Sequence, residues 1–194
     1  MSMTPDPPLG EVTMSSTRSF EAVTHEVFQP PRFGSFVRVG RNGSALYGVV
    51  SDVQTKPFGD NRRAIAFRLP WEELVREQPQ ITELLDTTFD VATVGFSDDY
   101  GLHHYLPPFP PRVHEAVFAA DPTEVAALTD SLEFVRTLAA LDHASTHELV
   151  AAAIREAALS RGRDDVFLSQ ASRVVADLFK DDYDTAMAIV RRLA

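Results

Sequence analysis

Residues 29–54 read QPPRFGSFVRVGRNGSALYGVVSDVQ and are typical of a β-hairpin. Two runs rich in β-branched residues, 33–39 and 45–54, flank the turn formers Arg41-Asn42-Gly43. Asn-Gly favours a tight hairpin turn, because both central positions take positive φ angles there. We therefore expect the first half of the chain to be built on an antiparallel β-sheet.

Further strands are predicted on both sides of this hairpin. Alternating apolar residues, with a period of two, indicate strands at residues 20–28, 62–69 and 87–96. Two short helical segments are expected between the last two strands, at residues 71–77 and 81–86. Five or six short strands with tight turns favour closure into a small barrel, because closure removes unpaired edges.

The segments that flank this barrel differ from it in composition. Residues 1–17 are rich in Pro, Ser, Thr and Met without an apolar period, and are predicted to be a flexible tail. The barrel domain is then expected at residues 18–106, and residues 107–120 form a proline-rich connector.

A C-terminal α-helical bundle is predicted for residues 121–194. Asp121-Pro122-Thr123-Glu124 is a helix start, with a capping side chain followed by proline at the first helical position. Four amphipathic helices are expected, beginning near Asp121, Thr146, Asp164 and Tyr183. The predicted fold class is α+β, a small closed β-barrel followed by a helical bundle.

Composition limits the classes of function. The chain has 194 residues, no cysteine and a net charge of −10, which excludes disulfides and thiolate zinc sites. The acidic excess is shared by both halves, so binding to nucleic acid is disfavoured. No apolar run is long enough to cross a bilayer and no signal peptide is recognisable, so we expect a cytoplasmic protein.

The order of elements resembles the HAS barrel, which opens the HerA-type hexameric DNA translocases and is shared with rotary ATP synthase subunits. The glycine-led strand is similar to Gly34-Ser-Phe-Val-Arg-Val39, and the strand after the hairpin to Leu46-Tyr-Gly-Val-Val-Ser-Asp-Val53. The proline-rich exit at residues 106–118 adds to the resemblance, which covers roughly residues 18–120. The chain looks like one of the bacterial proteins that pair such a barrel with a small helical domain.

The resemblance does not extend to the nucleotide-binding domain of those enzymes. Their phosphate loop needs a Gly-Lys pair, because backbone amides and a lysine hold the phosphates. The two lysines here, Lys56 and Lys180, do not follow glycine. The resemblance therefore implies a docking or assembly role for the barrel, without hydrolysis.

Candidates for metal or acid–base chemistry are few. His103 and His104 are adjacent, so they point to opposite faces of an extended segment, with His114, Asp98 and Asp99 nearby. We interpret them as structural, and we expect no catalytic residue, metal or cofactor. His143 and His147 have helical spacing, but a helix break is predicted between them, and Asp181-Asp182-Tyr183-Asp184 is interpreted as helix capping. Ser35, Ser51 and Ser97 do not lie in a nucleophile elbow.

Arginine and aromatic residues are predicted to gather at one end of the barrel. This composition is typical of protein interfaces and of barrels that bind single-stranded nucleic acid, and it also fits a solvated charged face. The candidate interaction residues are Arg32, Phe33, Arg38, Arg41, Tyr47, Phe58, Arg62 and Arg63.

Three functions follow from these observations. The preferred hypothesis is a non-enzymatic interaction or assembly module that docks onto a barrel-bearing ATPase in DNA processing, with homo-oligomers left open. The second is a nucleic-acid-binding barrel. The third is a metallohydrolase that uses His103 or His104.

Overall fold

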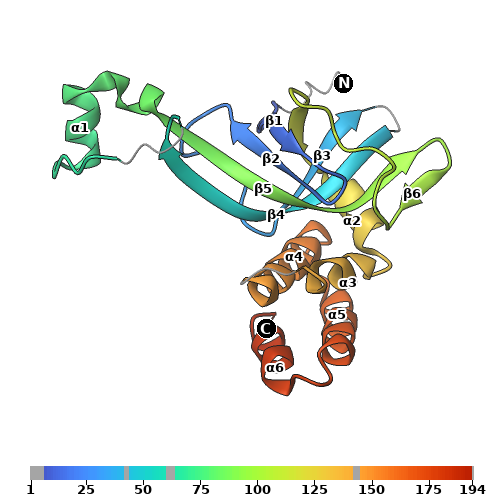
Figure 1. Ribbon diagram of the computed structural model, residues 1–194. Helices are drawn as coiled ribbons and strands as arrows, with labels where there is room; N and C mark the ends of the chain where they lie inside the picture. The colour runs from blue at the N-terminus through green and yellow to red at the C-terminus, as the bar shows by residue number, and fades with distance from the viewer. Residues whose placement is uncertain (1–6, 42–43, 60–63, 142–144, 194) are drawn as a thin grey trace.

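The computed structural model describes residues 7–41, 44–59, 64–141 and 145–193. The strands curl into a closed antiparallel barrel in the order β2-β1-β7-β3-β4-β5, where β5 pairs back onto β2 and also carries β6 (Figure 1). The strands are β1 (Gly10–Ser15), β2 (Ser19–Thr24), β3 (Phe36–Arg41), β4 (Ser44–Pro57), β5 (Leu85–Asp98), β6 (Gly101–His103) and β7 (Ala116–Ala119).

The predicted hairpin is confirmed as β3 and β4. Their register runs from Phe36 opposite Val49 to Arg41 opposite Ser44, and the turn residues 42–43 lie outside the described residues. Gly48 is required inside this hairpin, because a Cβ there would lie 2.3 Å from a methyl carbon of Val91 on β5.

The barrel interior is filled by apolar side chains from every strand of the closed ring. Their burial removes apolar surface from water and is the main stabilising contribution within the barrel. The members are Val12, Phe20, Ala22, Val37, Val39, Leu46, Val50, Phe89, Val91 and Val117.

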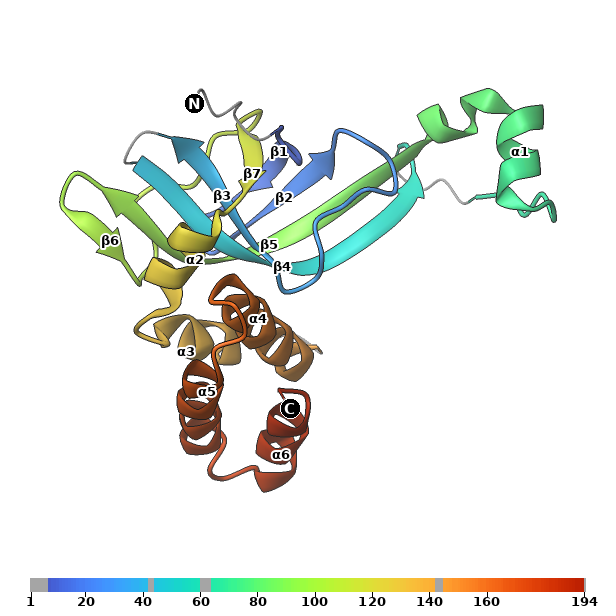
Figure 2. The same cartoon turned by 180° about the vertical axis from the view of Figure 1, so that it is seen from behind.

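Helices follow the barrel, as predicted, and pack against its outer wall (Figures 1 and 2). A second core is continuous across this contact. It joins Phe36, Tyr47 and Val94 of the barrel to Phe134 and Ile154 of the helices. The helices are α2 (Pro122–Thr129), α3 (Glu133–Ala139), α4 (Thr146–Ser160), α5 (Asp165–Leu178) and α6 (Tyr183–Arg191).

Two predicted boundaries of the barrel were wrong. Within the predicted tail, residues 10–15 form β1, which pairs with both β2 and β7. Within the predicted connector, residues 116–119 form β7, which pairs with β1 and β3. Both strands are short and gain stability from tertiary pairing, which local patterns do not reveal. The predicted strand at 20–28 also ends early, at Thr24.

The predicted strand at residues 62–69 is absent from the described part of that segment, residues 64–69. The described residues of the segment belong instead to an arm, residues 58–59 and 64–84, carried on the extended ends of β4 and β5 (Figure 1). The arm contains α1 (Trp71–Glu77), with the predicted bounds, and the 3-10 helix η1 (Pro79–Leu84), where the sequence predicted a helix at 81–86.

The first predicted C-terminal helix is divided into α2 and α3. Leu132 breaks it by taking a left-handed conformation with a φ of 58°. The predicted starts of α2, α4 and α5 are confirmed, and Asp121 and Asp164 cap α2 and α5 through side-chain hydrogen bonds. Asp182 likewise caps α6, as its interpretation predicted.

Candidate interaction site

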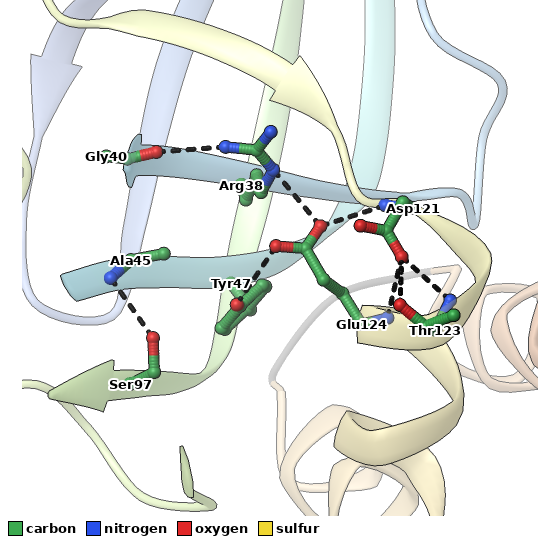
Figure 3. A network of polar contacts seen from close by, with 8 residues as sticks. All are labelled: Arg38, Gly40, Ala45, Tyr47, Ser97, Asp121, Thr123 and Glu124. Atoms are coloured by element: carbon green, nitrogen blue, oxygen red, sulfur yellow. Dashed lines mark hydrogen bonds and ion pairs between the residues drawn. The ribbon is translucent and has the colours of Figure 1, made fainter. Parts of the chain in front are cut away.

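Arg38 and Tyr47, two of the predicted interaction residues, face the helices of the same chain. Arg38 Nε lies 3.1 Å from Glu124 Oε2, in an ion pair whose N–H is poorly aligned for a hydrogen bond (Figure 3). The Tyr47 hydroxyl donates to Glu124 Oε1 at 3.3 Å. One carboxylate of α2 therefore binds β3 and β4 together.

Local helix chemistry positions this carboxylate. The Asp121 side chain accepts from the backbone N–H of Glu124, and Glu124 Oε2 accepts from the N–H of Asp121 at 2.9 Å. This reciprocal arrangement is a capping box, which fixes the first turn of α2. Hydrogen bonds, first from the Thr123 hydroxyl, lower the pKa of Asp121. Burial raises the pKa of the Tyr47 hydroxyl.

Arg32 and Phe33 meet the helices at a second point. Arg32 Nη2 donates to Glu156 Oε2 of α4 at 2.8 Å, although the arginine side chain stays largely exposed. Phe33 packs partly buried against the core shared with the helices. Next to it, a Cβ on Gly34 would lie 2.4 Å from the Cβ of Ala152, so glycine permits the close approach of α4.

The predicted residues therefore do not form one solvent-facing surface. Those that the structure describes on the barrel lie at the contact between barrel and helices, and Phe58 lies apart from them on the arm. Arg62 and Arg63 lie outside the described residues, as does the side chain of Arg41. Four of the eight candidates, Arg32, Phe33, Arg38 and Tyr47, thus serve an intramolecular contact.

The arm carries a group of exposed apolar side chains. It projects from the barrel on the side opposite β6 (Figure 1). Large apolar side chains are exposed along it, which soluble monomers usually avoid as a group. They are Phe58, Ile65, Phe67, Leu69, Trp71 and Leu84.

A contact from the barrel supports the root of the arm. Phe28, in the loop after β2, meets Trp71 edge-to-face, with ring centroids 5.0 Å apart. The backbone N–H of Phe28 donates to Thr87 Oγ1 of β5, and that hydroxyl also bonds to Thr55 of β4. The arm is thus attached through both its strands and this aromatic pair.

The histidines do not converge on one site. His103 Nε2 lies 2.9 Å from Asp98 Oδ1, and its ring stacks on Phe96; a hydrogen bond from this histidine lowers the pKa of Asp98. His114 pairs with Glu11 on a different part of the barrel. Across the described ranges, no three acidic or histidine side chains are grouped to hold a metal ion.

The remaining candidates have structural contacts. Ser35 Oγ donates to the carbonyl of Arg32, and Ser97 Oγ accepts from the N–H of Ala45. His147 pairs with its neighbour Glu148, and His143 lies outside the described residues.

Comparison with known families agrees with the topology. A family model described as the HAS barrel domain matches residues 9–99. The chain carries a HAS barrel domain. The matched residues run from the start of β1 to the end of β5, while β7 completes the HAS barrel from beyond them. The predicted resemblance is confirmed.

Two further findings concern the whole chain and its described helices. A search of curated proteins gave no match. No helix in the described ranges has the length and apolar character needed to span a membrane.

Sequence reasoning missed two structural features of this chain. Glu124 was recognised as a capping residue, but its ion pair with Arg38 joins elements 86 residues apart in sequence, which no local pattern shows. The arm was hidden because residues 62–69 alternate like a barrel strand. The sequence feature that could have indicated the arm is the group of turn formers at residues 56–61, followed by Pro70 and Pro79. These residues separate the segment from the regular barrel strands.

Proposed function

We propose that this protein is a non-enzymatic interaction and assembly module. The barrel and the helices form the supporting body, and the arm contacts a partner protein. The observation that carries the proposal is the exposure of Phe58, Trp71 and Leu84 on an arm that projects from that body. Exposed apolar groups of this kind mark interaction surfaces in soluble proteins.

The partner that we propose is a barrel-bearing ATPase of the HerA type, in the DNA-processing machinery of a bacterial cytoplasm. HAS barrels open such ATPases, and this chain has no Gly-Lys pair from which to build a phosphate loop. A module without its own motor would act by docking onto a protein that has one. This step rests on analogy between folds.

The contacts of the arginines favour protein over nucleic acid as the partner. Arg32 and Arg38 each pair with a glutamate of the same chain, and the chain carries a net charge of −10. Arginines neutralised in this way contribute little to phosphate binding.

Affinity purification from the source cell tests the proposal. Wild-type protein and the variant Phe58→Ser/Leu84→Ser are used as baits, and Val166→Ser is the control, because Val166 is an exposed apolar residue on α5, away from the arm. We expect wild-type and control baits to recover a phosphate-loop ATPase and the arm variant to lose it. Equal recovery by all three baits, or recovery of no ATPase, would contradict the proposal.

A further inference from the structure

Residues 64–69 have the pattern of a strand but no strand partner within the described chain. Ile65, Phe67 and Leu69 alternate with Ala64, Ala66 and Arg68, which is the period of a β-strand with one apolar face. The apolar side chains are 79%, 42% and 38% exposed, respectively. The segment therefore has an apolar face that the described residues leave partly exposed.

Backbone strain interrupts this segment. Arg68 has a φ of 58°, in the left-handed region, which is strained for a residue with a Cβ. A strand would need Arg68 in the extended region, where that cost is absent. Pairing with another strand would thus relieve strain at Arg68 and cover the three apolar side chains.

The end of β4 that leads into the arm is protected against the addition of another strand. On β4, the backbone N–H of Val53 is taken by Asp52 Oδ1 at 2.9 Å, and Pro57 has no N–H to offer. A charged side chain and a proline are the usual means of blocking an edge. Residues 64–69 contain no proline before Pro70 and one charged side chain, Arg68, so they are the accessible strand-like segment beside β4.

We propose that residues 64–69 pair antiparallel with the same residues of a second copy of this chain. With Phe67 opposite Phe67, Ile65 lies opposite Leu69, so all apolar side chains meet apolar ones. Arg68 then lies opposite Ala66, so no like charges face each other across the pair. Pro70 lies opposite Ala64 and ends the ladder at both ends.

This inference rests on the proposed role of the arm as an assembly element. It assigns residues 64–69 to a second copy, while Phe58 and Leu84 of the arm stay exposed for the ATPase. A two-fold pair of this kind is isologous, since the same residues act on both sides. The HAS barrels lie at the root of each arm, so the pairing would join two barrels through their arms.

Disulfide trapping tests the register, because the natural chain has no cysteine that could interfere. In Phe67→Cys the two sulfurs would lie opposite each other, at a Cα separation of about 4.5–5.5 Å, which a disulfide spans. In Ile65→Cys alone, the partner cysteine would lie four residues along the strand, about 13 Å away, too far for a disulfide. Under mild oxidation we expect the dimer to form roughly tenfold or more faster in Phe67→Cys.

A mixing experiment adds a second, independent readout. Ile65→Cys mixed with Leu69→Cys should give a disulfide-linked heterodimer, although Ile65→Cys alone does not dimerise. Circular dichroism checks that each variant is folded, and light scattering follows the self-association of the wild-type chain with concentration.

Selective linkage in Phe67→Cys and in the mixture would support the inference. Equal linkage of Phe67→Cys and Ile65→Cys would overturn the register, and a wild-type chain that stays monomeric with no linkage would overturn the pairing. If the arm recovers an ATPase but shows no self-linkage, only this inference fails. If self-linkage occurs but no ATPase is recovered, only the proposed partner fails.

Discussion

Replacing Glu124 with alanine tests whether its network ties the helices to the HAS barrel. The change removes the ion pair with Arg38 and the acceptor of the Tyr47 hydroxyl, and it opens the capping box at Asp121. A hydrogen bond to a charged group contributes about 1.5–3 kcal/mol and a helix cap about 1 kcal/mol. Because the Arg38 and Glu124 side chains are still 22% and 23% exposed, solvent screening lowers the sum, and we expect a loss of about 2–3 kcal/mol.

Urea denaturation followed by circular dichroism measures this loss. Glu133→Ala is the matched control, since Glu133 also lies in the first turn of a helix but its contact with Arg136 is 3.8 Å long and exposed. We expect that control to change stability by less than about 0.5 kcal/mol. Glu124→Gln keeps an acceptor and should recover part of the loss. If Glu124→Ala costs no more than the control, the network does not hold the two parts together.

Three further variants probe the same body. The pKa of Tyr47 is raised in the folded state, so its contribution to stability is complete below about pH 10 and is lost as pH rises through the folded value. Tyr47→Phe should therefore flatten the decline of the urea midpoint above about pH 10. In urea denaturation, Gly34→Ala should lower the free energy of unfolding by about 2–4 kcal/mol, because the new methyl group collides with Ala152 and the φ of 85° is strained for alanine. The control Gly162→Ala, with a φ of 73° and open space around it, should cost only about 1 kcal/mol, and equal costs would exclude the packing role of Gly34. The Arg161 guanidinium donates hydrogen bonds to α2 and lies over the Phe167 ring of α5. Arg161→Met should therefore lower the free energy of unfolding by roughly 2 kcal/mol and the melting temperature by several degrees, and an unchanged melting temperature would contradict this.

Local sequence signals predicted the elements whose stability is local. The β3–β4 hairpin follows from Asn42-Gly43 between β-branched runs, and α1 and α2 follow from proline at or before their first turns. These signals act within a few residues of the chain, so they survive without knowledge of the tertiary fold.

Signals that depend on a distant partner were missed or misread. The strands β1 and β7 close the barrel by pairing with each other across about 100 residues of sequence, and neither has a strong pattern of its own. Residues 64–69 have a strong pattern but no partner in the described chain, so the prediction of a barrel strand was wrong there.

The candidate site likewise combines residues that the sequence could select with a partner that it could not identify. The sequence predicted Arg38 and Tyr47 as part of a surface for an external partner, whereas the structure places both side chains against the helices of the same chain. It could not show that the partner is Glu124 of the same chain, 77 residues after Tyr47. The sequence did not predict the exposed arm, because it predicted a barrel strand at residues 62–69 instead.

Photo-crosslinking in the source cell tests the central claim, that the arm is where the protein meets its partners. Benzoylphenylalanine replaces Phe58 on the arm in one experiment and Tyr100, an exposed aromatic at the opposite end of β5, in the other. We expect position 58 to give specific adducts, with a barrel-bearing ATPase or with a second copy of the chain, and position 100 to give none. Adducts at position 100 without adducts at position 58 would contradict the account and place the interaction surface at the other end of the barrel.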